Sequence, residues 1–154
     1  LGGPTRRFGY RWAFEDPAVV GRLADQNVGP RQAALFKTFS PLIQRGIKRG
    51  LRVTVEGAER SLAKIRTTMT EIGERVAGRR YLVGDRFPAA DLAFACMAAP
   101  ILLPTPEEGY GAVWPALDDC PREFADVVRE MRASVAGQFA LRMFKEERRR
   151  PGER

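Results

Sequence analysis

The chain has 154 residues, which fits one domain that buries about 68–70% of the surface its unfolded form exposes. It contains no histidine, so His-based catalytic triads, His general bases and His metal ligands are all excluded. No apolar run reaches the ~18 residues that a membrane-spanning helix needs, and no secretory signal follows Leu1. We therefore expect a cytoplasmic protein without a membrane partner.

The cysteines support this expectation, because they form neither a CxxC pair nor a metal-binding spacing. Cys96 lies in an apolar helical run, which predicts a buried free thiol. We expect no bound metal. The chain also has no initiator Met, so we expect it to be part of a longer protein.

The net charge of +7 is concentrated in residues 1–52, which hold ten Arg or Lys and three Asp or Glu. A basic third of this kind suits nucleic acid, an acidic partner domain or an anionic small molecule. The arginines are scattered along apparent helices and form no dense basic run, so we expect a solvated or interface-facing surface and no nucleic-acid partner.

Four aromatic residues crowd the first fifteen positions, where a short helix is predicted to begin at Thr5. They either pack on the rest of the chain or line a pocket or a domain interface. After the Gly29-Pro30 break, a second helical segment carries apolar residues on one face at Phe36, Phe39, Ile43, Ile47 and Leu51. Pro41 predicts a kink or a restart near Ser40.

The clearest periodicity covers residues 55–76, where apolar positions recur every three or four residues and Gly78 marks the end of a helix. Residues 88–103 are apolar on nearly every side, which predicts a central helix. A Pro-rich loop at 104–121, a helix after Pro121 and a last helix capped by Ser134 follow. No strand is predicted. We expect an all-α bundle of about five to seven helices over residues 1–148, with an exposed basic tail at 149–154.

The stretch YLVGDRFPAADLAFA, residues 81–95, has the layout of a capped helix start. If Pro88 is the N-cap, Asp91 occupies the third helical position, but proline lacks the hydroxyl and the amide hydrogen of a capping box. If Pro88 is instead the first helical residue, Phe87 caps the helix and Asp91 accepts from amides in the Gly84–Phe87 turn. Either way, we interpret Asp91 as a structural residue, because no second acid, base or nucleophile stands beside it.

These residues resemble the signature of the C-terminal helical domain of cytosolic glutathione transferases: an apolar pair, Gly-Asp, any residue, Phe, Ser or Thr, two residues, and Asp-Leu. The matching residues are Leu82, Gly84, Asp85, Phe87, Asp91 and Leu92, and Pro88 departs at the Ser or Thr. The resemblance extends over most of residues 10–148. Helical domains attached to elongation factors, tRNA synthetases and chloride-channel-like proteins share this motif.

The resemblance implies a two-domain enzyme whose thioredoxin-like domain binds the co-substrate glutathione and activates its thiol. This chain shows no pattern for that domain, so it contains no catalytic residue that can be named, and we expect it to be inactive alone. The helical domain then supplies a pocket for a small hydrophobic electrophile and a homodimer interface. The family places these surfaces on the first two helices, which makes Tyr10, Trp12, Phe14 and Arg11 the substrate-binding candidates. Arg6, Arg7 and Arg11 would face glutathione or the partner subunit.

The alternative function is a non-catalytic interaction module of the same fold, of the kind associated with translation factors or synthetases. Under this alternative the helical bundle docks other proteins and no electrophile is bound. The resemblance in residues 81–95 is common to both functions, so the motif alone leaves both open.

Overall fold

The computed structural model describes residues 1–147, and every regular element in that range is helical. The elements are α1 (Gly2–Ala13), α2 (Pro17–Asn27), α3 (Pro30–Gly50), α4 (Val55–Val76), α5 (Ala89–Leu102), α6 (Arg122–Ala133) and α7 (Val135–Glu147), with two short 3-10 turns, η1 (Pro106–Glu108) and η2 (Leu117–Asp119). The predicted all-α bundle is confirmed for this range. No helix in it is both long and apolar enough to cross a membrane. The predicted tail at 149–154 lies outside the described residues.

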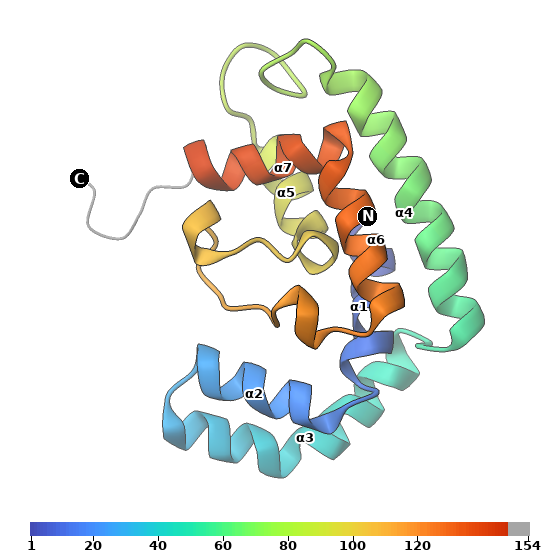
Figure 1. The fold of residues 1–154 in the computed structure, drawn as a ribbon, viewed down its shortest axis with the longest axis vertical. Coiled ribbons are helices and arrows are strands. Elements are labelled where there is room, and N and C mark those ends of the chain that lie inside the picture. The colour runs from blue at the N-terminus through green and yellow to red at the C-terminus, as the bar shows by residue number, and fades with distance from the viewer. Residues whose placement is uncertain (148–154) are drawn as a thin grey trace.

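The core surrounds α5, which contacts α1, α6 and α7, while α4 runs along one side and packs on α1 and α7 (Figure 1). The side chains of Ile65, Ile101 and Val128 are fully buried in this core. The last two helices each bury one apolar face, which consists of Phe124, Val127, Val128, Met131, Phe139, Ala140, Met143 and Phe144.

Helix α4 follows its predicted bounds because its sequence specifies both ends. The Thr54 hydroxyl accepts a hydrogen bond from the Gly57 amide at 3.0 Å, as an N-cap does. Gly78, just after the C-cap, has φ of +72°, a left-handed conformation that favours glycine. Val55 departs from its predicted inward position, since it is 53% exposed.

The beginning of α1 differs from the prediction. The helix starts at Gly2, and Thr5 is a fully buried residue inside it. The Thr5 hydroxyl donates to the Met97 carbonyl of α5 at 2.8 Å. Thr5 therefore joins two helices and caps neither. Helix α3 continues through Pro41, so of the two predicted outcomes the restart does not occur, and a kink at this position stays a prediction.

Helix α5 is central, but it is not covered on every side. Leu92 and Met97 are 49% and 45% exposed, and Cys96 is exposed as well. The predicted burial of Cys96 is therefore wrong. An apolar composition identified the helix, but it did not show that one face would lack a covering element within the described chain.

Two glycines permit backbone contacts that no other residue allows. A Cβ atom on Gly109 would lie 2.3 Å from the Phe144 carbonyl oxygen of α7, and Gly109 also has φ of +87°. A Cβ atom on Gly137 would lie 2.0 Å from the Met131 carbonyl oxygen, at the corner between α6 and α7. These contacts set how closely the loop after α5 and the end of α6 approach α7.

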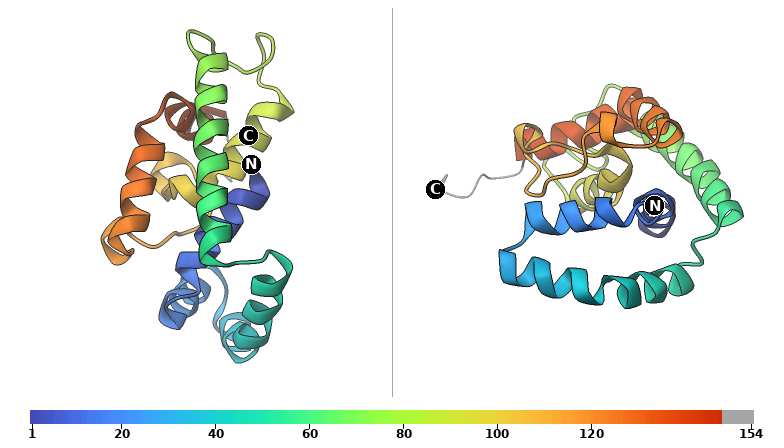
Figure 2. Two further views of the ribbon diagram at one scale, coloured as in Figure 1. Left: turned by 90° about the vertical axis from the view of Figure 1, so that its right-hand side faces the viewer. Right: turned by 60° about the horizontal axis from the view of Figure 1, so that its bottom comes forward.

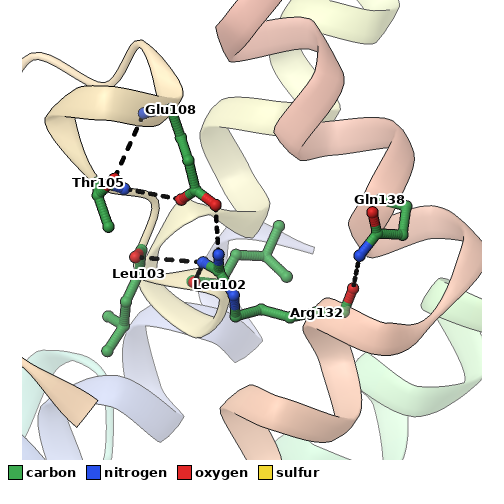
Figure 3. Close-up of polar contacts among 6 residues, drawn as sticks. All are labelled: Leu102, Leu103, Thr105, Glu108, Arg132 and Gln138. Carbon is green, nitrogen blue, oxygen red and sulfur yellow. Dashed lines mark hydrogen bonds and ion pairs between the residues drawn. The ribbon is translucent and has the colours of Figure 1, made fainter.

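Arg132 of α6 fastens the C-terminal end of α5 (Figure 3). Its guanidinium donates to the Leu102 carbonyl at 2.7 Å and pairs with Glu108 of η1. Glu108 also accepts from the Thr105 amide, and the Thr105 hydroxyl accepts from the Glu108 amide, so η1 begins with a capping box. One cation thus joins two helices and a loop.

Helices α2 and α3 form a hairpin at the edge of the molecule (Figures 1 and 2). The two helices pack on each other, and α1 leads directly into α2. Across from the hairpin lies the loop between α5 and α6, and the two cavities described below lie in this region.

Candidate functional site

The first of two adjoining cavities has a volume of about 550 Å³ and lies between the hairpin, the end of α1 and the 112–114 segment. Its walls are mostly apolar and include Phe14 at the C-cap of α1, Val20 and Leu23 from α2, and Phe36 and Ile43 from α3. Asn27, Gln32 and Gln44 are its amide-bearing residues. Cavities of this size with mostly apolar walls and few polar groups are typical of small-molecule sites.

The second cavity, of about 210 Å³, lies deeper between α1 and the loop that follows α5. Trp12, Pro100 and Phe124 form apolar parts of its wall, and Arg6, Asp119 and Cys120 also line it. The two cavities share Tyr10, Ala13, Leu23 and Trp114, and we refer to them together as the cleft.

Local sequence explains how α1 presents its aromatic side chains to the cleft. Tyr10 and Phe14 are four residues apart, so they lie on one helical face, where their rings stack at a centroid distance of 4.9 Å. The Lys48 ammonium of α3 lies 5.7 Å from the Phe14 ring centroid, a cation–π contact. Trp12 lies toward the core and contacts Phe8 and Phe124.

Three of the four predicted substrate-binding residues are therefore in the cleft: Tyr10, Trp12 and Phe14. Arg11 lines a separate groove of about 240 Å³ between α1, α4 and α6. It pairs with Glu15 and lies over the outer face of the Trp12 ring at 5.7 Å. A role for Arg11 in substrate binding stays a prediction that this placement does not support.

The other N-terminal arginines have intramolecular partners. Arg7 donates to the Leu51 carbonyl at 2.6 Å and to the Ser61 hydroxyl at 3.2 Å, which ties α1 to the α3–α4 connection. Arg6 donates to the Gly2 carbonyl of its own helix and borders the second cavity. Of the two, only Arg6 is placed to meet a ligand in the cleft.

Asn27 connects the hairpin to the opposite wall of the cleft. Its side-chain amide donates to the Val113 carbonyl at 2.9 Å and accepts from the Val113 amide at 2.8 Å. A side chain thus makes the pair of bonds that one strand makes with another. The sequence analysis missed Asn27, Leu23 and Trp114, because each becomes a wall residue only through a contact distant in sequence.

Burial affects three polar groups in the walls of the cleft. Burial, with a smaller effect from the Asp119 charge, raises the pKa of the Cys120 thiol, so the nucleophilic thiolate is disfavoured. The indole N–H groups of Trp12 and Trp114 are buried and have no hydrogen-bond partner among residues 1–147. No cluster of three or more potential metal ligands occurs in that range either.

The 81–95 stretch has a structural role outside the cleft. Pro88 is the N-cap of α5 and Asp91 is its third residue, which agrees with the first capping frame and makes the second one wrong. Asp91 is fully buried, and its carboxylate accepts from the Leu82 amide at 3.2 and 3.3 Å, and not from the Gly84–Phe87 turn. Burial raises the pKa of Asp91, while the Leu82 hydrogen bond and the Arg142 charge partly offset that rise.

The other capping candidates hold the turn before α5. Gly84 has φ of +67°, a conformation that favours glycine, and Phe87 packs against the Tyr81 ring at 6.3 Å. Asp85 is exposed, and its side chain makes no hydrogen bond that the described residues show. The motif therefore shapes the loop between α4 and α5 and contributes no reactive group to the cleft.

No family model, curated protein or solved structure matches this chain.

Proposed function

We propose that this chain is the helical half of a glutathione transferase-like protein, and that the cleft holds a small hydrophobic electrophile. The observation that carries this proposal is the pair of adjoining apolar cavities whose walls include Tyr10, Trp12 and Phe14. The resemblance in residues 81–95 also supports it, because it is the source of the prediction that these three residues line a pocket. The thiol-activating residue would lie in a glutathione-binding domain.

In this proposal the cleft contributes binding and orientation. An apolar electrophile loses its hydration there, and the aromatic walls fix the direction from which a glutathione thiolate attacks its carbon. The attack forms a carbon–sulfur bond and, for an aryl halide, expels a halide ion. A homodimer of the full-length protein belongs to the same proposal.

Tryptophan fluorescence tests the binding step, because both tryptophans of the chain line the cleft. We expect a nitroaryl halide to quench this fluorescence with saturation. Ala13 lines both cavities, so Ala13→Phe fills the shared space and is expected to weaken binding at least tenfold, on the order of 1.4 kcal/mol. Ala63→Phe, at an exposed position of α4 outside the cleft, is the matched control and should bind normally.

Linear quenching without saturation, or equal binding by both variants, contradicts the binding step and favours an interaction module. The transferase step has its own test. The chain alone should not accelerate the reaction of glutathione with the aryl halide, whereas fusion to a glutathione-binding thioredoxin-like domain should. Conjugation by the isolated chain at enzyme rates would overturn the proposal, and saturable binding without conjugation in the fusion would remove the transferase assignment alone.

A further inference from the structure

The outer face of α3 is an exposed apolar stripe. Leu35, Phe39 and Leu42 are 62%, 51% and 71% exposed, and their spacing of four and three residues places them on one side of the helix. Only Ala33 and Ser40 of this 21-residue helix are buried. Figure 2 shows α3 at the rim of the molecule, with α2 on its inner side. The stripe therefore faces away from the core.

The charges on α3 are all positive. The helix has five basic residues and no acidic one. Lys37 pairs with Asp25 of α2 at 2.6 Å, and Lys48 lies over the Phe14 ring, so both have partners on the inner side. The described residues provide no ion pair or hydrogen bond for the other three side chains, which belong to Arg31, Arg45 and Arg49.

These three arginines lie along one edge of the apolar stripe, on the side of Leu42. Arg31 is four residues before Leu35, and Arg45 and Arg49 are three and seven residues after Leu42, so helical spacing places all three beside it. A helix with an exposed Leu and Phe face, bordered by cations and low in overall hydrophobicity, has the composition of an interfacial membrane helix. The guanidinium group also fits phosphate geometry with two parallel hydrogen bonds.

We propose that α3 is a peripheral membrane-binding helix that lies along an anionic phospholipid surface. The stripe inserts at the boundary between headgroups and acyl chains, and Arg31, Arg45 and Arg49 bind lipid phosphates. This attachment needs no spanning helix. It does not depend on the proposed ligand of the cleft.

The positive charge of α3 and the small size of its exposed apolar face favour a membrane surface over a protein as the partner. A second copy of α3 on the stripe would bring two all-positive helices together, which is unfavourable, so the homodimer proposed for the full-length protein would use another surface. A specific protein interface takes about 20–30 residues from each side, whereas α3 exposes five large apolar residues, Leu35, Phe36, Phe39, Leu42 and Ile43. A membrane surface requires no matching partner surface, because each inserted side chain and each cation adds to the affinity separately.

Vesicle co-sedimentation of the chain tests the proposal, with phosphatidylcholine vesicles that contain or lack phosphatidylserine. We expect binding to the anionic vesicles, weaker at high salt. The triple variant Arg31→Gln, Arg45→Gln and Arg49→Gln should lose about fivefold in partition coefficient per arginine, or on the order of a hundredfold in total. The triple variant Leu35→Gln, Phe39→Gln and Leu42→Gln should also lose binding, because insertion no longer occurs.

The matched control is Arg60→Gln, Lys64→Gln and Arg75→Gln, which removes the same charge from exposed positions of α4. It should keep most of the binding, and circular dichroism should show that all variants retain their helices. Equal binding by the α3 and α4 charge variants would overturn the proposal, as would equal binding to neutral vesicles. Retention on nucleic acid or an acidic protein without vesicle binding would overturn it too.

Discussion

Pro88 occupies a helix N-cap with neither of the groups that normally act there. Because the proline ring has no hydroxyl, the Asp91 amide donates to the Pro88 backbone carbonyl instead, at 3.2 Å. The Asp91 carboxylate, which would return to the cap amide in a capping box, reaches the Leu82 amide instead. Because Pro88 has no amide hydrogen, the buried Asp91 carboxylate accepts its hydrogen bond from the segment before the turn.

The N-cap frame predicts the effect of restoring a hydroxyl at this position. Pro88→Ser provides an acceptor for the Asp91 amide, whereas Pro88→Ala removes the proline without adding one. Chemical denaturation should therefore show Pro88→Ser to be more stable than Pro88→Ala by about 0.5–2 kcal/mol. Both variants lose the rigidity of proline in the unfolded chain, so their difference isolates the cap. Equal stabilities would show that the Ser hydroxyl does not cap α5.

At the scale of elements, periodic helices were predictable and exposed faces were not. Helix α4 matches its predicted bounds because spacing, an N-cap and a terminal glycine are all local signals. Cys96 was expected to be buried, but whether a neighbour covers a face of a helix is decided by contacts distant in sequence. Thr5 illustrates the same limit, because a residue type suited to an N-cap was recruited as a bridge between helices.

The contacts of Arg132 with α5 and η1 should contribute measurably to the free energy of unfolding. Arg132→Met keeps much of the aliphatic stem but removes the donor to the Leu102 carbonyl and the partner of Glu108. Because these groups are partly buried, we expect the free energy of unfolding to fall by about 1.5–3 kcal/mol in urea titrations. Arg129→Met on the same helix is the control, since Arg129 is 53% exposed and, among residues 1–147, pairs with Asp126 alone at 2.8 Å. That exposed pair should be worth less than about 1 kcal/mol, and similar losses in both variants would contradict the role of Arg132.

At the scale of the whole molecule, the hairpin and the loop opposite it together form the cleft. The aromatic cluster at Tyr10, Trp12 and Phe14 was recognisable from sequence, because its density exceeds what one buried stripe can absorb. The opposite walls were not, since Leu23 and Trp114 meet there only after α2 and the Pro-rich loop have packed. The resemblance supplied the pocket hypothesis, and chain topology supplied its remaining residues.

Asn27 should control how often the cleft opens. Asn27→Ala removes both hydrogen bonds to Val113, each worth about 0.5–1.5 kcal/mol. We expect the Val113 amide to exchange with deuterated water about tenfold faster, while amides of α5 keep their protection. Gln26→Ala, at an exposed neighbouring position, should leave that exchange unchanged. An unaltered Val113 rate in Asn27→Ala would show that the bond pair does not hold the cleft closed.

The close contacts at Gly109 and Gly137 also restrict which residues related sequences can carry at these two positions. Most core positions accept several apolar residues of similar volume, so related sequences diverge there without loss of the fold. A side chain at either glycine would overlap the backbone of Phe144 or Met131, and no exchange of neighbouring side chains relieves a collision with main-chain atoms. Descendants that keep this bundle must therefore keep both glycines, 28 residues apart in the sequence. That spacing is a fingerprint by which distant relatives can be recognised after the rest of their sequence has drifted.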